Sequence, residues 1–520
     1  MRTATANQMR QIDAEAIEHR GIPSLVLMER AAQAVADKAS SLLHSEQLEH
    51  PARVAVLCGA GNNGGDGFAA ARILRESGIE ATAFLVGDPD RMTPDCKEMA
   101  RRLIEAGGKV VPFDSSDERL KRCDLYLDAI VGVGLHAPLR GRAALAADFL
   151  AQTAKGQILA VDIPSGIDAD TGRDLGCGFC CRATVTFTLP KQGHFIGAGS
   201  VACGSLTVAD IGIPTDLVER FPSQLEALTA KTVRTFLPKR DPAGHKGTFG
   251  KVLVLGGSVG YTGAPILAAE AALRSGTGLV YLGVPESVYP IAAVKCYESM
   301  PFPLPSLEDG THSPEAASHA LALAQGKDAL LIGPGLGQSG GALSLLETIL
   351  TRSDAPLVVD ADGLNLLAQN LSLLQARQNK VTILTPHDGE FTRLGGDLSS
   401  GDRLGAACTF AQRHNVILIL KGRGTLVALQ NGRAFVNTTG NSGMAKGGSG
   451  DALSGILLAL LGQHIPPEQA AAAAVWLHGH AGDLAAAEKG EYGMLPRDLI
   501  AALPQAFSCV SETASPKLFK

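Results

Sequence analysis

The sequence predicts an α/β protein of two domains, each built on a parallel sheet with helices on both faces. The chain has 520 residues, which is more than one ordinary hydrophobic core holds. In both halves, buried strand patterns alternate with helical patterns, and this alternation is typical of parallel sheets. Residues 212–232 interrupt the rhythm with two prolines and mixed polarity. We therefore place the domain boundary near residue 220.

The first half begins its sheet with a buried strand at 53–59. The glycine-rich stretch GNNGGDG (61–67) is expected to be a loop, and the helix after it to end at Gly78. The remaining strands of this half are expected at 80–87, 124–132, 156–164, 182–189 and 204–212.

The second half starts a new strand at 250–258, followed by a helix at 263–276. Residues 425–437 predict a hairpin, because Asn431-Gly432 is the signal of a type I′ turn. Pro466-Pro467 should start a long Ala-rich helix. The other strands of this half are expected at 278–285, 328–335, 356–363, 381–387 and 415–422.

Composition indicates a globular protein without a strong basic field. Hydrophobic residues make up 45% and charged residues 19% of the chain. The 46 basic and 52 acidic residues give a net charge of −6, which gives a nucleic-acid role little support. The N-terminus lacks an apolar signal region, and no apolar run approaches eighteen residues. We expect a cytoplasmic protein with no membrane partner.

The ten cysteines are scattered, which favours unpaired thiols in a reducing compartment. Cys177, Cys180 and Cys181 form the one cluster. Zinc would need a fourth ligand from Cys203 or His194, and no second CxxC is present. Small structural residues are the favoured interpretation of this cluster.

The strongest local signal of the first half is CGAGNNGGDG (58–67), between a strand and a helix. Its glycines would let the backbone approach a phosphate-bearing ligand, with Asn62, Asn63 and Asp66 as polar contacts. The spacing is not GxGxxG, which disfavours a plain NAD dehydrogenase. The alternative is a glycine-rich turn capped by asparagine.

Two further loops carry a carboxylate at a strand end, at 127–138 and 161–172. Loops of this kind gather at the carboxyl edge of a parallel sheet, so Asn63, Asp128 and Ser165 could converge there. Three oxygen donors suit a weakly held monovalent cation better than zinc. Asp162 would be left to move a proton, unless it serves as a turn cap.

The order GNNGGDG, DAIxGxGL, VDIPSGIDADTG and TVTFxxPKxG, with IPSLVLMERA at 22–31, closely resembles the NAD(P)H-hydrate epimerase domain. The resemblance implies a Rossmann-like three-layer domain over 1–220, acting on NADH or NADPH hydrated at the nicotinamide ring. It implies potassium on Asn63, Asp128 and Ser165 and a catalytic role for Asp162. The substrate contacts it implies are Asn62, Asn63, Gly64, Gly65, Asp66, Gly132, Val133, Gly134, Leu135, His136, Ala137 and Pro138. Val133 stands where many relatives carry a small hydroxyl residue.

In the second half, five glycines surround Asp451 in NSGMAKGGSGDALSG (441–455), just before an apolar helix. Such a loop offers unpaired N–H groups at the positive end of a helix, which is a ready site for phosphate. A carboxylate beside an anion is better explained as a base acting on a hydroxyl, or as an N-cap.

Six motifs in order, from KGTFGKVLVLGGSVGYTGAP (246–265) to GGSGDALSG (447–455), resemble an ADP- or ATP-dependent NAD(P)H-hydrate dehydratase. The resemblance implies a ribokinase-like α/β domain over 228–515, with Asp451 as the catalytic base and Mg²⁺ bound with ADP. It assigns Gly263, Gly335 and His387 to the hydrate, and Lys421, Gly422, Arg423, Gly424, Thr425 and Gly450 to the nucleotide. Lys446 could touch a phosphate or point to solvent, and Asp388 replaces an expected proline. His478 and His480 are interpreted as packed or solvated.

The sequence therefore predicts a bifunctional repair enzyme, an isomerase and lyase of NAD(P)H hydrates, that is homo-oligomeric like the proteins it resembles. ADP is favoured over ATP by resemblance only, and the NADH or NADPH preference stays open. The alternative is a ribokinase-like kinase of a small alcohol, such as a vitamin precursor, fused to a non-catalytic Rossmann-like binding module.

Overall fold

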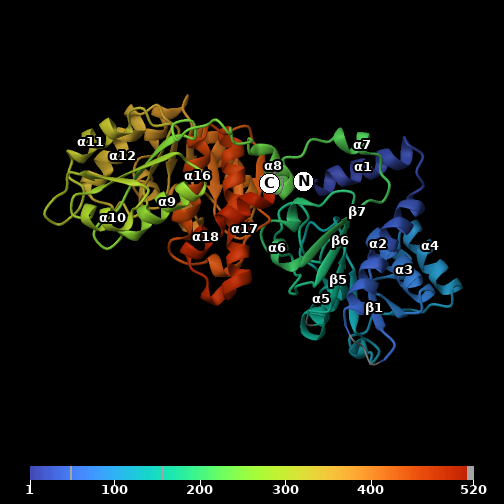
Figure 1. Cartoon of the computed structure of the whole chain (residues 1–520). Coiled ribbons are helices and arrows are strands. Elements are labelled where there is room, and N and C mark those ends of the chain that lie inside the picture. The colour runs from blue at the N-terminus through green and yellow to red at the C-terminus, as the bar shows by residue number, and fades with distance from the viewer. Residues whose placement is uncertain (47–49, 155, 512–520) are drawn as a thin grey trace, which may run out of the picture. The chain divides into compact units, whose positions relative to one another are not determined.

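The computed structural model describes residues 1–46, 50–154 and 156–511. The chain divides into two compact units, Arg2–Leu225 and Glu226–Lys520 with Met1, called here the N-terminal and the C-terminal unit. Figure 1 shows the helices and strands of both units.

The N-terminal unit is built on a seven-stranded parallel sheet with the strand order β3-β2-β1-β4-β5-β6-β7. The first six strands follow the doubly wound Rossmann order, in which the direction of winding reverses between β1 and β4. The strands are β1 (Arg53–Cys58), β2 (Glu80–Leu85), β3 (Val110–Pro112), β4 (Leu125–Ala129), β5 (Ile158–Val161), β6 (Ala183–Phe187) and β7 (Ser205–Ala209).

Alternate side chains of β1 face two apolar layers, as the two-residue period of a strand requires. Val54 and Val56 pack in one layer, and Ala55 and Leu57 pack in the other. In Figure 1, α2, α3 and α4 cover one face of this sheet and α5 covers the other. The helices are α1 (Ala6–Glu18), α2 (Ser24–His44), α3 (Asn62–Glu76), α4 (Pro94–Glu105), α5 (Gly141–Thr153), α6 (Gly199–Ala202) and α7 (Thr215–Glu219), with short 3-10 turns at Pro89–Arg91, Leu120–Arg122 and Gln192–His194.

The C-terminal unit contains a ten-stranded sheet with the order β11-β10-β9-β12-β13-β14-β15-β16-β17-β8. Pairing is parallel from β11 to β15, and the pairs β15–β16 and β16–β17 are antiparallel. The strands are β8 (Leu225–Ala227), β9 (Lys251–Leu255), β10 (Leu279–Pro285), β11 (Met300–Leu304), β12 (Ala329–Ile332), β13 (Leu357–Val359), β14 (Thr382–Leu384), β15 (Ile417–Leu420), β16 (Leu426–Ala428) and β17 (Ala434–Val436).

Two helical layers cover the central strands of this sheet. Val252 and Val254 of β9 pack with α9, α16, α17 and α18, and on the other face α11 contacts β9 and α15 contacts β15. The helices are α8 (Ala230–Phe236), α9 (Gly263–Arg274), α10 (Tyr289–Lys295), α11 (Ala316–Ala324), α12 (Gly340–Arg352), α13 (Asp362–Leu367), α14 (Asp388–Arg393), α15 (Arg403–His414), α16 (Ser449–Gly462), α17 (Pro467–Gly493) and α18 (Pro496–Val510), with 3-10 turns at Leu371–Arg377 and Ser442–Met444.

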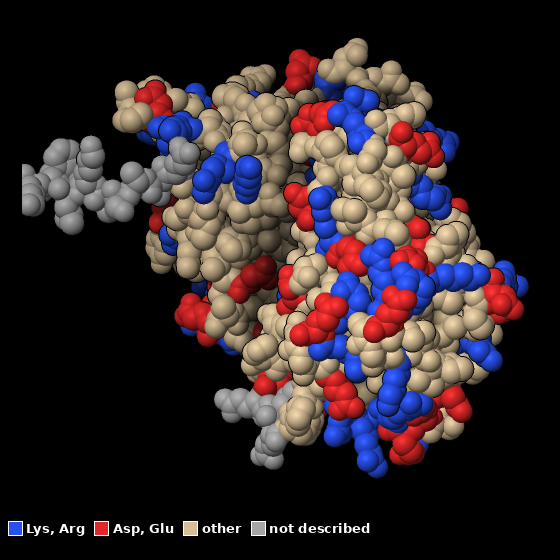
Figure 2. Space-filling view, turned by 90° about the vertical axis from the view of Figure 1, so that its right-hand side faces the viewer, with Lys and Arg blue, Asp and Glu red and all other residues tan. Residues whose placement is uncertain are grey.

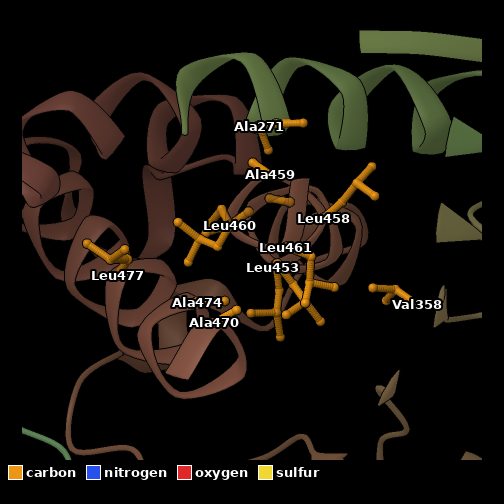
Figure 3. Packing of buried hydrophobic residues seen from close by; sticks show 14 of the residues in the cluster. Ala271, Val358, Leu453, Leu458, Ala459, Leu460, Leu461, Ala470, Ala474 and Leu477 are labelled. Carbon is orange, nitrogen blue, oxygen red and sulfur yellow. The ribbon is translucent and has the colours of Figure 1, made fainter. Parts of the chain in front are cut away.

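Helix α16 is the most deeply buried helix of the C-terminal core. Figure 3 shows its leucines between Ala271 of α9, Val358 of β13 and the alanines of α17. Gly455 lets α16 approach α9 closely, because a Cβ at this position would lie 2.1 Å from the carbonyl oxygen of Ala268. The start of α16 is therefore held by a rigid core.

The structure confirms the predicted strands, adds the short strands β3 and β8, which were not expected, and differs in three further local features. Helix α3 already begins at Asn62, so the expected loop at 61–67 is wrong. The hairpin at 425–437 is confirmed, but its turn is not type I′, because only Gly432, and not Asn431, has a positive φ. Strand β11 was not expected, since its sequence contains two prolines, which the edge of a sheet tolerates.

The described residues contain no helix that is long and apolar enough to cross a membrane. Figure 2 shows Lys and Arg interspersed with Asp and Glu over the face in view. This face therefore carries no continuous basic field, as the composition suggests.

Candidate active sites

The predicted site of the N-terminal unit lies where the winding of its sheet reverses. Loops after β1 and β4 meet at this point, which is where open parallel sheets bind ligands. The backbones approach so closely that a Cβ on Gly59 would lie 1.9 Å from the oxygen of Ile130, and one on Gly64 would lie 1.8 Å from the oxygen of Gly59. The glycines of this motif thus pack the first turn of α3 against the strand ends, which explains why a helix replaces the expected loop.

Asp128 and Ser165 form one buried polar pair. The Ser165 hydroxyl donates to Oδ1 of Asp128 at 2.5 Å, and its backbone N–H donates to Oδ2 at 2.7 Å. Burial raises the pKa of Asp128 to about 6, although the Ser165 bonds oppose the shift. The Val131 N–H donates to the hydroxyl oxygen of Ser165, and the next residue, Gly132, lies beside the side-chain amide of Asn63. The structure thus brings Asn63, Asp128 and Ser165 to one turn.

Asp162 follows β5 with φ of 67°, which is rare for a residue with a side chain and occurs where the surroundings enforce it. Lys191 Nζ donates to its Oδ1 at 2.5 Å, and the Thr186 hydroxyl donates to the same oxygen at 2.8 Å. Burial alone would raise the pKa of Asp162, but Lys191 outweighs it and holds the pKa below its usual value. Asp162 is therefore an ionised carboxylate.

His194 supports the same residue from the backbone side. Its Nδ1 accepts the Lys191 backbone N–H at 2.9 Å, so Nε2 carries the proton and donates to the Asp162 carbonyl at 2.9 Å. Burial, with Lys191, lowers the pKa of His194 to about 4. The imidazole is neutral and fixes the strained turn.

Two further carboxyl groups interact with this centre. Burial raises the pKa of Asp66 well above its usual range, and the nearby charges of Asp162 and Asp13 add to the shift. Asp13, on α1, has its pKa raised to about 6, again chiefly by burial. The unit therefore holds one ionised and two protonatable carboxyl groups around the Lys191 ammonium.

The 132–138 loop follows β4 into this site. Val133 is half-buried and packs against the core, whereas residues 136–138 are exposed. All ten cysteines are unpaired, and no cluster of three or more His, Cys, Asp or Glu residues in the described chain could hold a metal ion. Cys177, Cys181 and Cys203 are buried, in agreement with a packing role.

The C-terminal unit has a cleft of about 580 Å³ at the corresponding reversal, between β9 and β12. The loops after these strands are bonded together: Gly257 N–H donates to the Pro334 oxygen at 2.9 Å, and the Ser258 hydroxyl to the Gly335 oxygen at 2.8 Å. The cleft brings together the predicted residues Gly263, Gly335, His387 and Asp451.

Asp451 lies in the first turn of α16, and the residue that caps this helix is Gly448, with φ of 102°. The N-cap alternative for Asp451 is therefore excluded. No side chain caps the helix; the Ser449 N–H donates to the Lys446 carbonyl oxygen at 3.2 Å, and the next N–H groups, of Gly450 and Asp451, stay available. Burial, together with the charge of Asp360, raises the pKa of Asp451 to about 7. This carboxyl group can accept or release a proton near neutral pH.

Lys421 forms an ion pair with the fully buried Asp360 at 2.9 Å and lies 3.6 Å from Glu390. Burial lowers the pKa of Lys421, but the two carboxylates outweigh it and raise the pKa overall. Asp360 also accepts the Ser454 hydroxyl at 2.6 Å, and Lys421 Nζ lies 3.5 Å from where a Cβ of Gly450 would be. Lys421 is thus fixed beside the start of α16.

The remaining residues of the predicted nucleotide loop form a tight turn between β15 and β16. The Thr425 hydroxyl donates to the Gly422 oxygen at 2.8 Å, and Gly422 and Gly424 have positive φ. Residues 421–425 do not line the 580 Å³ cleft. Of residues 421–425, Lys421 is the one that the structure places beside Gly450.

His387 is both a cap and a cleft residue. Its Nδ1 accepts the N–H groups of Gly389 and Glu390, at 3.0 and 3.3 Å, at the start of α14. Glu390 accepts the His387 N–H in return, which completes a capping box. The ring also lines the cleft, so the turn and ligand interpretations of His387 are compatible.

Three residues left open by the sequence now have defined contacts. Lys446 donates to the carbonyl oxygens of Tyr492 and Met494, at 2.8 and 2.5 Å, so neither a phosphate contact nor a solvent position describes it. Asp388 forms an ion pair with Arg403. His478 is half-buried, and its Nε2 is hydrogen-bonded to the Ser449 carbonyl oxygen at 2.9 Å, so it supports the start of α16.

Sequence reasoning missed several residues of both sites. Lys191 belongs to the quoted motif TVTFxxPKxG, and that motif could have indicated it. Asp13 carries no local signal, because only the packing of α1 brings it near Asp162. Tyr261 lies in the quoted motif 246–265 and Glu390 in the motif LTPHDGEF (384–391), so these motifs could have indicated them, whereas Arg393 lines the C-terminal cleft outside the six motifs.

Comparisons with known proteins identify the families of both parts of the chain. Residues 24–193 match the family described as YjeF-related protein N-terminus, and residues 252–505 match the one described as NAD(P)H-hydrate dehydratase. The bifunctional NAD(P)H-hydrate repair enzyme Nnr of Moorella thermoacetica is 40% identical over 521 residues, which cover 98% of each chain. The enzyme of the same name from Escherichia coli strain K12 is 35% identical, over 96% of this chain and 92% of its own.

Solved structures resemble the C-terminal part. A ribokinase-like superfamily protein from Enterococcus faecalis is 28% identical with a TM-score of 0.50, and the match covers 56% of this chain and 99% of that one. An ADP/ATP-dependent NAD(P)H-hydrate dehydratase from Bacillus subtilis, co-crystallised with ATP and Mg²⁺, is 32% identical with a TM-score of 0.48, over 55% of this chain and 99% of its own. The two-domain α/β prediction and both family resemblances are confirmed. The chain belongs to the family of bifunctional NAD(P)H-hydrate repair enzymes.

Proposed function

We propose that this chain repairs hydrated NADH and NADPH in two steps. The N-terminal unit interconverts the R and S hydrates, and the C-terminal unit dehydrates the S form with ADP, giving AMP and phosphate. The observation that supports the proposal is that one unit holds the buried Asp162 paired with Lys191, and the other holds Asp451, with a pKa raised to about 7, in the first turn of a helix that no side chain caps.

Epimerisation of the hydrate requires a proton to leave and return at the carbinolamine. Lys191 and Thr186 occupy Oδ1 of Asp162, so Oδ2 is the oxygen that would accept the substrate proton. Burial raises the pKa of Asp66 well above its usual range, which favours the protonated form, so Asp66 would act as the acid. The carboxylate can accept the proton that leaves the substrate, and the carboxylic acid can donate a proton back, so one site meets both requirements of the reaction.

A potassium ion fits Asn63, Asp128 and Ser165. Asp128 is fully buried, and none of the ion pairs among the described residues neutralises it. The side-chain nitrogen of Asn63 is also buried without a hydrogen-bond partner, so this amide is uncommitted and can turn its oxygen towards an ion. Oxygen donors with one negative charge suit a monovalent cation. Bound there, potassium would supply positive charge to the dinucleotide.

Dehydration needs a better leaving group than hydroxide. Asp451 would take the proton from the ring hydroxyl as that oxygen attacks the terminal phosphate of ADP. The uncapped N–H groups of α16 and the Lys421 ammonium would stabilise the transferred phosphoryl group. Phosphate then leaves together with a proton from the neighbouring ring carbon, and the ring double bond of the reduced nicotinamide is restored. Mg²⁺ bound with ADP would neutralise the phosphate charges.

The test is recovery of reduced-nicotinamide absorbance from NADPH hydrates, with potassium and magnesium, in separate runs with ADP and ATP. We expect full recovery with ADP and one AMP and one phosphate per ring restored. A stable phosphorylated product without reduced nicotinamide would replace this function by a small-alcohol kinase. The cytoplasmic location and the homo-oligomeric state stay predictions.

A further inference from the structure

The C-terminal cleft is lined by more negative than positive side chains. Asp362, Glu390 and Asp451 line it, and Arg393 is the one Lys or Arg among its lining residues. A hydrated dinucleotide carries a bridging pyrophosphate, and its NADPH form carries a further 2′-phosphate. Like charges in a shared cleft repel, so a ligand of this charge needs a cation there.

Lys421 cannot fill this role. It is bound to Asp360 at 2.9 Å and lies near Glu390 at 3.6 Å, so carboxylates already surround its ammonium. It is also placed at the start of α16, beside Gly450, where the nucleotide phosphate is proposed to lie.

Arg393 has no such partner. No ion pair or hydrogen bond of the described residues involves its guanidinium, and the side chain is exposed to the cleft. The position that a Cβ of Gly389 would take is 3.0 Å from the His387 ring and 3.9 Å from Nη1 of Arg393. The guanidinium therefore flanks the same turn as His387, a residue assigned to the hydrate. The neighbouring Asp388 is already paired with Arg403.

From this placement we infer that Arg393 binds a phosphate group of the hydrated dinucleotide, and so contributes to substrate specificity in the dehydratase cleft. The inference rests on the proposed function. An arginine offers two parallel N–H donors to a phosphate, and such charge-assisted bonds are stronger than neutral ones. The phosphate is either the bridging pyrophosphate or the 2′-phosphate of the NADPH form.

The experiment compares Arg393→Ala and Arg393→Lys with the unmodified chain, using the S hydrates of NADH and NADPH separately at saturating ADP. We expect Arg393→Ala to raise KM for the hydrate by about 10-fold with kcat little changed, the size of a lost exposed charge-assisted contact. Arg393→Lys should restore part of the affinity, because the charge remains and the paired donors do not.

Arg352→Ala is the matched control. Arg352 is also the last residue of its helix, α12, and is exposed, and it does not line the cleft. Both substitutions remove the same favourable charge from a helix C-terminus, so any general effect on the fold is shared. The epimerase activity of the same samples reports whether the rest of the chain is intact.

Each outcome has a defined meaning. A KM increase for the NADPH hydrate alone assigns Arg393 to the 2′-phosphate, and equal increases for both hydrates assign it to the pyrophosphate. An unchanged KM for both hydrates overturns the inference, as does an increase confined to the KM for ADP, which a separate titration of ADP at saturating hydrate measures. If the unmodified chain dehydrates neither hydrate, the proposed function fails instead.

Discussion

Removal of the charge on Asp360 should move the pH dependence of dehydration towards acid. The base Asp451 must be deprotonated to act, and its pKa is raised to about 7. In the unmodified chain, kcat/KM for the hydrate therefore rises with pH and is half-maximal near pH 7. Asp360 contributes to this raised pKa, so Asp360→Asn lowers the pKa and shifts the rise to lower pH.

The size of the shift follows from the geometry. Ser454 donates to Asp360 at 2.6 Å and lies one helical turn after Asp451, which puts the two carboxyl groups roughly 7 Å apart. At an effective dielectric constant of about 20, that interaction is worth about 2.4 kcal/mol, and water in the cleft reduces it. We expect the pH profile to shift by roughly one pH unit. At pH 6, kcat/KM as a fraction of its own plateau should then be about fivefold higher in Asp360→Asn than in the unmodified chain.

The assay is the initial rate of reduced-nicotinamide recovery at low hydrate concentration, from pH 5 to 9. Each profile is scaled to its own plateau, because Asp360→Asn also weakens the position of Lys421 and lowers the plateau. Asp354→Asn is the control, since that carboxylate is 90% exposed and pairs with Lys380 away from the cleft. An Asp360→Asn profile superimposed on that of the unmodified chain would refute the reasoning.

Three further predictions concern buried contacts. Lys191→Met leaves the Asp162 charge unpaired, so the N-terminal unit should lose about 3–5 kcal/mol of unfolding free energy, measured by urea titration. The dehydratase activity should be retained. An unchanged midpoint of the urea titration would mean that the Lys191–Asp162 pair contributes nothing to stability. Arg377→Met removes the donors to four oxygen acceptors in a side chain that is 1% exposed, so the C-terminal unit should lose about 3 kcal/mol or more in the same titration. Gly455→Ala places a Cβ 2.1 Å from the Ala268 oxygen and should cost about 1–3 kcal/mol. Gly340→Ala meets nothing within 4 Å and should be neutral or slightly stabilising, and equal losses in both glycine variants would contradict this packing argument.

Local patterns were sufficient to predict all strands except β3, β8 and β11, and to select candidate site residues at strand ends. Asp162 and Asp451 became candidates because a carboxylate at a strand end, or one among glycines before an apolar helix, is a local feature of the sequence. The conformation of the glycine motif could not be predicted, because it depends on contacts with Ile130, which lies far along the chain. A glycine can serve a loop or a tight helix contact equally well.

The contacts that the sequence did not predict involve residues from distant segments of the chain. Lys446 lies in the glycine-rich motif before α16, yet its ammonium binds the carbonyl groups at the end of α17, which no pattern near residue 446 reveals. Asp13 and Lys191 reach Asp162 from opposite ends of the N-terminal unit. Their effects on the charge of the site depend on burial, and burial is a property of the folded chain.

The division of labour between the two units is tested most directly with one mixture of R and S NADPH hydrates, ADP, potassium and magnesium. The unmodified chain should restore all of the reduced nicotinamide. Asp162→Asn should restore only the S fraction in the rapid phase, and Asp451→Asn should restore none while it still interconverts the two hydrates. Rapid and complete recovery with Asp162→Asn, or recovery at the unmodified rate with Asp451→Asn, would contradict the account.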